Sequence, residues 1–209
     1  VPNAAYSEEA LCSVSEPLSD ELHSLVDRLR GDGCKIVVAL GRFHYAKGFD
    51  VLLHSIKHVV NVHRQTYLLL IGDGDEREAL EKLSKKLGID GRVKFIGAMN
   101  KPFLLMRQAD LYVHSSRWDG LPTTLIEASA IGLPCVSFDC DYGPREIIVP
   151  EVSGVLVSPV GSALALASAI IRLLDNADFS RTLSFNARTA VKKYSSDSVA
   201  DCFLSALSE

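Results

Sequence analysis

Residues 110–139 read DLYVHSSRWDGLPTTLIEASAIGLPCVSFD, and this stretch decides the fold. It begins and ends with short, nearly continuous apolar runs, which are typical of buried strands. Between them, Pro122 suits the first turn of a helix, Gly132 suits its C-terminal end, and Pro134 prevents the helix from continuing. The stretch therefore predicts a strand, a helix over 122–131 and a second strand.

The same alternation of apolar runs and helical patterns extends along the chain. Strands are predicted at 35–40, 66–71, 92–97, 110–115, 134–139 and 154–158. Helices are predicted at 20–31, 48–62, 75–88, 101–108, 122–131 and over 162–208, with a less regular stretch at 143–149. This order predicts an α/β fold, a Rossmann-like doubly wound parallel sheet of about six strands with helices on both faces. Ligands of such sheets bind in the loops at the carboxyl ends of the strands.

Composition excludes several classes of protein. The 209 residues are 47% hydrophobic, which is enough for one buried core, and no window of about 18 apolar residues predicts a membrane span. No signal peptide is recognisable at the start, so we expect a soluble cytoplasmic chain. The net charge of −4, without a lysine or arginine cluster, excludes nucleic acid as an expected partner. The five cysteines are scattered without CxxC spacing, which indicates reduced thiols.

The chain divides into two parts. Residues 1–19 are polar, contain Pro2 and Pro17, and show no clear periodicity, so we interpret them as a linker remnant outside the core. Residues 20–209 are predicted to form one domain that includes the C-terminal helices.

The loop after the first predicted strand carries two cations close to glycines. Gly41, Arg42, Lys47 and Gly48 lead directly into a helix. A guanidinium and an ammonium five residues apart can both reach one diphosphate, the first as a fork and the second as a point charge. The loop predicts a phosphate clamp, and the alternative is a turn with two solvated cations.

The loop after the fourth predicted strand ends at the start of the helix over 122–131. Free amides at a helix start, assisted here by the hydroxyls of Thr123 and Thr124, bind anions such as phosphate. Asp119 precedes this helix start and Glu127 lies about one turn inside it, so two carboxylates could accept hydrogen bonds from hydroxylated rings on both sides of the phosphates. A nucleotide-sugar is such a ligand. The alternative makes Asp119 a helix cap and Glu127 a solvated side chain.

Three further patterns are weaker. Gly72 and Gly74 resemble the start of GxGxxG, but Arg77 replaces the third glycine, so a turn before the next helix is preferred. Asp139 and Asp141 have the D-x-D spacing of a divalent-metal site, although such acid pairs are common in polar loops. The remaining pattern consists of the histidines at 54, 58 and 63, which lack the other ligands of a zinc site.

Several of these segments together resemble a known family. GRFHYAKGFDVLL, YLLLIGDGDEREALEKL, RVKFIGAMN, DGLPTTLIEASAIGLPCVSFDCDYGPREII and SGVLV occur in that order over roughly 34–175. The chain resembles the C-terminal, donor-binding domain of retaining glycosyltransferases of the glycogen-synthase-like "group 1" family, which have the two-domain GT-B fold. The resemblance implies that an N-terminal acceptor domain is absent from this sequence, and we expect the fragment alone to be inactive.

The resemblance also implies roles for particular residues. Arg42 and Lys47 would bind the donor diphosphate and stabilise the leaving nucleotide, and Asp119 would contact the sugar, which makes these three the expected catalytic residues. The expected donor-binding residues are Gly41, Phe95, Gly97, Gly120, Leu121, Thr123, Thr124, Leu125 and Glu127, with the base held by backbone groups at 95–97 and the ribose by Glu127. The family's commoner glutamate is replaced by Asp119, a carboxylate that reaches about 1.3–1.5 Å less far, so donor choice could differ.

The implied function is transfer of a hexose-type sugar from a nucleoside diphosphate of the UDP or GDP type to a hydroxyl, with retention and without a metal or other cofactor. The implied acceptor is a glycan or lipid-linked glycan, as in cell-surface polysaccharide synthesis, and it would place the intact enzyme at the inner face of a membrane. Two alternatives stay open, namely a non-catalytic nucleotide-sugar-binding module and a GT-B-fold epimerase or phosphorylase.

Overall fold

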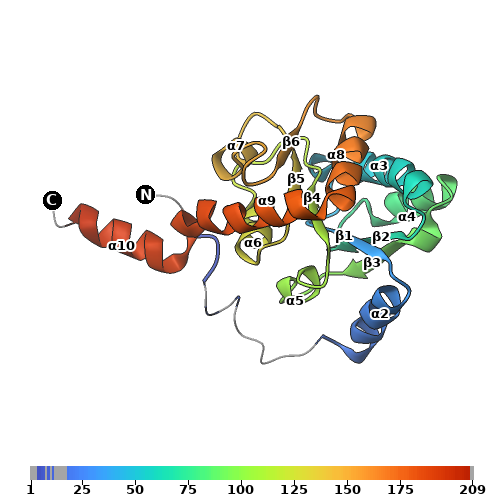
Figure 1. Ribbon diagram of the computed structural model, residues 1–209, viewed down its shortest axis with the longest axis horizontal. Coiled ribbons are helices and arrows are strands. Elements are labelled where there is room, and N and C mark those ends of the chain that lie inside the picture. Colours follow the sequence, from blue (N-terminus) through green and yellow to red (C-terminus); the bar gives the residue numbers. More distant parts are fainter. Residues whose placement is uncertain (1–3, 8, 10, 12–17, 208–209) are drawn as a thin grey trace.

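The computed structural model describes residues 4–7, 9, 11 and 18–207, and its centre is one six-stranded parallel sheet (Figure 1). The strands are β1 (Lys35–Leu40), β2 (Thr66–Ile71), β3 (Val93–Gly97), β4 (Leu111–His114), β5 (Cys135–Phe138) and β6 (Val155–Val157). Their order in the sheet is β3-β2-β1-β4-β5-β6, and every neighbouring pair is parallel. The predicted α/β fold with six parallel strands is confirmed.

Helices connect the strands and cover both faces of the sheet (Figure 1). They are α2 (Asp20–Gly31), α3 (Phe49–Val62), α4 (Arg77–Lys86), α5 (Phe103–Met106), α6 (Thr123–Ala130), α7 (Pro144–Ile147), α8 (Ala163–Asp175), α9 (Ala177–Ala190) and α10 (Ser196–Leu207). Short 3-10 turns are η1 (Tyr45–Lys47), η2 (Asp90–Arg92) and η3 (Lys192–Tyr194). The predicted helices are all present, while η1 lies inside a stretch that the sequence predicts as an irregular loop.

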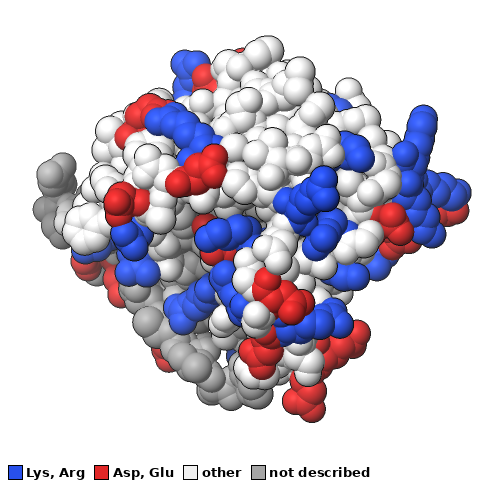
Figure 2. All heavy atoms as spheres, turned by 45° about the vertical axis from the view of Figure 1, so that its right-hand side comes forward, with Lys and Arg blue, Asp and Glu red and all other residues white. Residues whose placement is uncertain are grey.

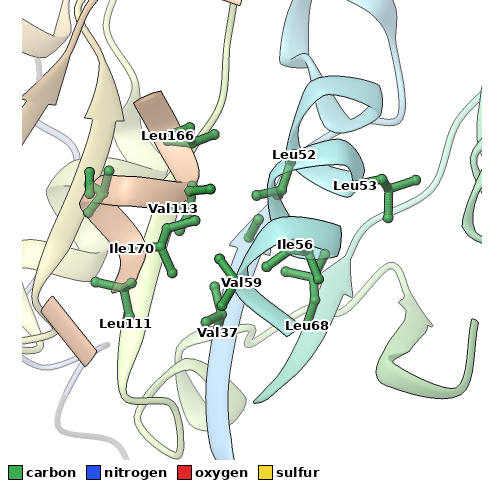
Figure 3. Close-up of a cluster of buried hydrophobic side chains, with 14 of the residues drawn as sticks. Val37, Leu52, Leu53, Ile56, Val59, Leu68, Leu111, Val113, Leu166 and Ile170 are labelled. Atoms are coloured by element: carbon green, nitrogen blue, oxygen red, sulfur yellow. The ribbon is translucent and has the colours of Figure 1, made fainter. Parts of the chain in front are cut away.

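The side chains of each strand alternate between two hydrophobic clusters, one on each face of the sheet. In β1, Val37 and Ala39 join the first cluster, and Ile36 and Val38 join the second. Figure 3 shows the first cluster, where side chains of α3 and α8 meet those of β1, β2 and β4. Because both faces are covered, the strands read as continuous apolar runs rather than as alternating ones.

The chain changes direction between β1 and β4. From β1 the sheet grows outward through β2 to β3, and the chain then returns to place β4 on the other side of β1. The helix after β1, α3, packs in the first cluster, and the helix after β4, α6, packs in the second, so the two connections leave neighbouring strands for opposite faces. Open α/β sheets bind ligands at the carboxyl edge next to such a change of direction. This topology brings the two loops that the sequence singled out next to each other.

The N-terminal segment contributes to the core. Tyr6 and Leu11 are buried in the second cluster, and Tyr6 forms a parallel bridge with Ser195. The prediction that residues 1–19 lie outside the core is therefore wrong for Tyr6 and Leu11. Burial removes the apolar surface of both side chains from water, which stabilises the folded chain. Residues 1–3, 8, 10 and 12–17, which include both prolines of that prediction, lie outside the described residues.

Candidate functional site

Direct contacts join the loop after β1 to the loop after β4. The Ser115 hydroxyl donates to the carbonyl of Lys47 at 2.8 Å, and the Arg117 amide donates to the carbonyl of Ala46 at 2.8 Å. Gly48 makes this approach possible because its φ is +62° and a Cβ at this position would lie 2.2 Å from the Ser115 carbonyl oxygen. A residue with a side chain would push the two loops apart.

A second pair of glycines supports the loop after β1 from its other side. A Cβ at Gly72 would lie 2.0 Å from the Gly41 carbonyl oxygen, and a Cβ at Gly74 would lie 2.5 Å from that of Phe43. The Phe43 amide donates to the carbonyl of Asp73 at 2.9 Å, which holds the two loops in contact. These glycines thus permit close packing of one loop on another, which agrees with the preference for a turn over a dinucleotide-binding motif.

Lys47 and Asp119 form the centre of the site. The Lys47 Nζ lies 2.6 Å from Asp119 Oδ2, and the two side chains are 30% and 15% exposed. The aliphatic stem of Lys47 passes close to Gly41, since a Cβ there would lie 3.6 Å from its Cγ and Cδ. Two residues that the sequence predicts for the diphosphate and for the sugar are therefore paired with each other.

The buried His114 ring contacts the Asp119 carboxylate. The ring is 3% exposed, with Nε2 lying 3.1 Å from Asp119 Oδ2 and Nδ1 lying 2.9 Å from Ser137 Oγ. Burial lowers the pKa of His114 more than the Asp119 carboxylate raises it, so the ring is neutral near pH 7. A neutral ring has one N–H, and a carboxylate only accepts, so Nε2 carries the proton. The Ser137 hydroxyl, which contacts Nδ1, donates to the Phe138 carbonyl at 2.8 Å.

These contacts control the ionisation of Asp119. Burial raises the pKa of the Asp119 carboxyl, but the hydrogen bonds from His114 and Lys47 and the Lys47 charge outweigh it and hold the pKa well below its ordinary value. Asp119 therefore stays a carboxylate at any physiological pH and can accept hydrogen bonds from a ligand. Its oxygen Oδ2 also lies 3.4 Å from the Ser116 hydroxyl.

We expect Asp119→Asn to lower the free energy of unfolding by about 2 kcal/mol near neutral pH. A carboxyl whose pKa is lower in the folded state stabilises the fold above its unfolded pKa, and this contribution disappears as the pH falls towards the folded pKa. The difference between variant and parent should therefore shrink at about pH 3. Urea unfolding at both pH values measures it, with the exposed Asp141→Asn as control. An equal difference at both pH values would contradict the role of the ion pair.

The start of α6 follows this pair. Pro122 occupies the N-cap position, and no side chain of the described residues caps the helix, so the interpretation of Asp119 as a cap is wrong. Thr123 is exposed, and the Thr124 hydroxyl accepts a hydrogen bond from the buried Tyr112 hydroxyl at 2.7 Å. The Leu125 side chain is buried and its amide donates to the Pro122 carbonyl at 2.9 Å, and its place in the donor site stays a prediction.

Glu127 lies inside α6 and is partly buried. Burial raises the pKa of its carboxyl, and no cation pairs with it among the residues of known placement. A partly desolvated carboxylate without a counter-ion gains from hydrogen bonds donated by a ligand. This environment suits the predicted contact with ribose hydroxyls and disagrees with a fully solvated side chain.

The other predicted residues take different positions. Arg42 is exposed, and its guanidinium lies 3.4 Å from the Asp75 carboxylate. It pairs with this acid and not with Asp119. Gly120 is exposed, while Leu121 packs against the second hydrophobic cluster. Arg42 thus pairs with an exposed carboxylate near the end of β1, and its contact with a diphosphate stays a prediction.

The predicted base-binding backbone is at the end of β3. The Phe95 ring, which is partly buried, packs edge-on against Phe43 with centroids 6.0 Å apart. The Gly97 carbonyl accepts from the Gly72 amide at 2.8 Å, which ties the end of β3 to the loop after β2, and contact of this backbone with a base stays a prediction. A cleft of about 650 Å³ beside this strand is lined by Phe95, Ile96 and Met99 together with residues of α2.

The two candidate metal patterns do not form a coordination site. Asp139 receives two hydrogen bonds from the Arg145 guanidinium, at 2.5 and 2.6 Å, and is therefore neutralised within the protein. His54 and His58 are both exposed on α3. Within the described part of the chain, no group of three or more His, Cys, Asp and Glu side chains is arranged to hold a metal ion.

The charged surface is mixed. On the face shown in Figure 2, lysine and arginine side chains are interspersed with aspartate and glutamate, so a nucleic-acid backbone would meet acidic as well as basic groups there. Among the helices of the described residues, none is both long enough and apolar enough to span a bilayer.

Sequence reasoning missed the residues that support the site. His114 ends a strand whose apolar pattern conceals it, and Ser137 lies inside the next strand. Arg117, whose guanidinium donates to both Asp50 oxygens at 2.9 and 2.7 Å, also went unrecognised. A polar residue at the carboxyl end of a buried strand is the one local signal that could have pointed to His114.

Comparison with known sequences places these features among sugar-transferring enzymes. The family model "Glycosyl transferases group 1" matches residues 26–190. The lipopolysaccharide core biosynthesis glycosyltransferase LpsE of Rhizobium meliloti is 32% identical over 186 residues, covering 87% of this chain and 53% of that protein. An uncharacterized glycosyltransferase of Methanocaldococcus jannaschii is 32% identical over 153 residues, covering 73% of this chain and 36% of that protein. The chain thus spans about half of these relatives or less.

Solved structures have the same architecture. A mutant of S. aureus TarM, in complex with Fondaparinux, alpha-GlcNAc-glycerol and UDP, superposes with a TM-score of 0.76 at 25% identity, covering 82% of this chain and 35% of that one. Anabaena HepE in complex with UDP and glucose superposes with a TM-score of 0.80 at 24% identity, covering 91% of this chain and 53% of that one.

Proposed function

Because the chain belongs to the group 1 glycosyltransferase family, we propose that it is the donor-binding domain of a retaining enzyme that transfers a sugar from a nucleoside diphosphate to a hydroxyl group. The observation that carries the proposal is the Lys47–Asp119 pair, which joins the loops after the neighbouring strands β1 and β4 directly before the start of α6. A cation for phosphate and a carboxylate for sugar hydroxyls are the two groups that such a donor requires side by side.

The donor lies along the carboxyl edge of the sheet. Its base binds the backbone after β3 at 95–97, and its ribose donates to Glu127. The diphosphate lies between the loop after β1 and the first amides of α6, where Lys47 and Arg42 neutralise it. The sugar then reaches Asp119. UDP complexes of TarM and HepE support a uridine donor, although GDP satisfies the same phosphate contacts.

Catalysis by this domain is mainly electrostatic. As the bond between the anomeric carbon and the diphosphate breaks, negative charge grows on the phosphate oxygens, and Lys47, Arg42 and the dipole of α6 stabilise it. The acceptor hydroxyl attacks from the same face, and a donor phosphate oxygen accepts its proton, which gives retention. No metal is required, because these cations already neutralise the leaving group.

The acceptor is a glycan or a lipid-linked glycan, bound mainly by a preceding domain. The relatives support this, since they include the lipopolysaccharide enzyme LpsE and the amylovoran biosynthesis glycosyltransferase AmsD of Erwinia amylovora. A lipid-linked acceptor would place the reaction at the cytoplasmic face of a membrane.

Calorimetric titration of the chain with UDP, GDP and ADP tests the proposal. We expect UDP or GDP to bind with an affinity that is the same in magnesium and in EDTA, because the arginine and lysine take the place of a metal. Failure of all three nucleotides to bind would refute the donor-binding role. Binding that disappears in EDTA would refute metal independence alone.

A further inference from the structure

Two exposed aromatic side chains lie on the same two loops as the Lys47–Asp119 pair. Tyr45 belongs to η1 after β1, and Trp118 directly precedes Asp119 in the loop after β4. Their ring centroids are 5.8 Å apart and their planes are inclined by 57°. Tyr45 is 54% and Trp118 is 56% exposed, whereas the Asp119 side chain is 15% exposed. The aromatic pair is therefore the outer part of a site whose inner part is charged.

Arg117 fixes Tyr45 in position. Its guanidinium donates to the Tyr45 carbonyl at 2.7 Å and lies 4.0 Å from the centre of the Tyr45 ring. Asp50 holds the same guanidinium through both carboxylate oxygens, and this hydrogen bonding raises the pKa of Arg117. A ring held in this way loses little conformational entropy when a ligand covers it. The exposed aromatic surface is thus preorganised.

We infer that Tyr45 and Trp118 form a stacking subsite for a sugar ring of the acceptor, an inference that rests on the proposed function. In the sheet, β3 and β4 lie on opposite sides of β1. A donor whose base lies beside β3 and whose sugar reaches Asp119 therefore ends at the loop after β4. The next ring outward belongs to the acceptor, whose hydroxyl must approach the donor sugar.

The chemistry of the two partners matches. One face of a pyranose ring presents C–H groups, which pack on an aromatic ring while the hydroxyls at the edge stay in contact with water. Tyrosine and tryptophan combine a large apolar face with a polar atom. Their side chains therefore tolerate exposure to water when no ligand is bound, and their apolar faces can pack against a sugar ring. The subsite would orient the acceptor without taking part in bond breaking.

Tryptophan fluorescence tests this subsite directly, because Trp118 is the only tryptophan in the sequence. With the chain saturated with UDP, the methyl glycosides of glucose, galactose and N-acetylglucosamine are titrated in turn. We expect at least one glycoside to change the emission saturably. Tyr45→Ala should weaken its binding about tenfold, while Tyr45→Phe, which keeps the ring, should not. Phe185→Ala, which removes a 75% exposed aromatic side chain from α9, is the matched control and should also have no effect.

The outcomes separate this subsite from the donor site. The affinity for UDP, measured by calorimetry, should be equal in Tyr45→Ala and in the parent chain. If Tyr45→Ala instead lowers the affinity for UDP-glucose more than the affinity for UDP, the two aromatic rings bind the donor sugar and the inference is overturned. It is also overturned if none of the three glycosides changes the emission. Absence of UDP binding in the parent chain would overturn the proposed function, and this is seen before any glycoside is added.

Discussion

Gly48→Ala is expected to lower the free energy of unfolding by about 3 kcal/mol or more, which is a large share of the stability of a domain of this size. The left-handed conformation at φ +62° contributes about 1–2 kcal/mol of this loss in a residue with a Cβ. The remainder comes from the backbone oxygen of Ser115, which a Cβ would approach to 2.2 Å and which cannot move without separating the two loops. Urea unfolding measures the change.

Gly88→Ala is the matched control for this substitution. Gly88 has a φ of +67°, close to that of Gly48, but a Cβ at this position has no neighbour within 4 Å. Its replacement should therefore lower the stability by only about 1 kcal/mol. Equal losses of stability in the two variants would show that only the backbone conformation matters. The close contact of the loops after β1 and β4 would then not depend on the lack of a Cβ at position 48.

Lys47→Met is expected to weaken UDP binding by roughly 10- to 100-fold, because a hydrogen bond from a charged donor to a phosphate is lost. Methionine keeps an unbranched stem next to Gly41, so the packing of the loop is preserved and the change isolates the charge. Isothermal titration calorimetry of parent and variant with UDP and UDP-glucose measures the effect. The exposed Lys85 of α4 provides the control variant, Lys85→Met, which should bind UDP and UDP-glucose with the same affinity as the parent chain.

Asp119→Asn sharpens the interpretation of this result. Because the carboxylate holds Lys47 in the empty site, its loss should leave the affinity for UDP equal or higher, while the affinity for UDP-glucose relative to UDP falls. Lys47→Met should weaken both ligands alike. If the two variants behave identically, the assignment of the lysine to the phosphates and of the aspartate to the sugar is wrong.

The sequence predicts the sheet well because its strands are buried on both faces. A continuous apolar run such as KIVVAL needs no tertiary information to be recognised, and Pro122, Gly132 and Pro134 delimit the central helix through local backbone constraints alone. Family resemblance then assigns Lys47 and Asp119 to one donor site although 71 residues separate them. Their direct contact is not predicted by the sequence and comes from the structure.

The supporting residues could not be predicted because they act through contacts that are distant in sequence. His114 becomes important only when β5 places Ser137 against one ring nitrogen and the next loop places Asp119 against the other. Likewise, the reason for Gly72 and Gly74 is the backbone of another loop, which a local pattern does not reveal. Tyr6 and Leu11 were missed because an isolated apolar residue in a polar segment gives no periodic signal.

Under the proposed function, the pairing of Lys47 with Asp119 has a consequence for turnover. The nucleotide that remains after sugar transfer would still contact Lys47 but would offer no hydroxyl to Asp119. Dissociation of that nucleotide would let the two side chains return to their distance of 2.6 Å, and the recovered contact would favour the empty site. We expect the spent nucleotide to be held less firmly than the intact donor, so that the resting protein assists its own product release.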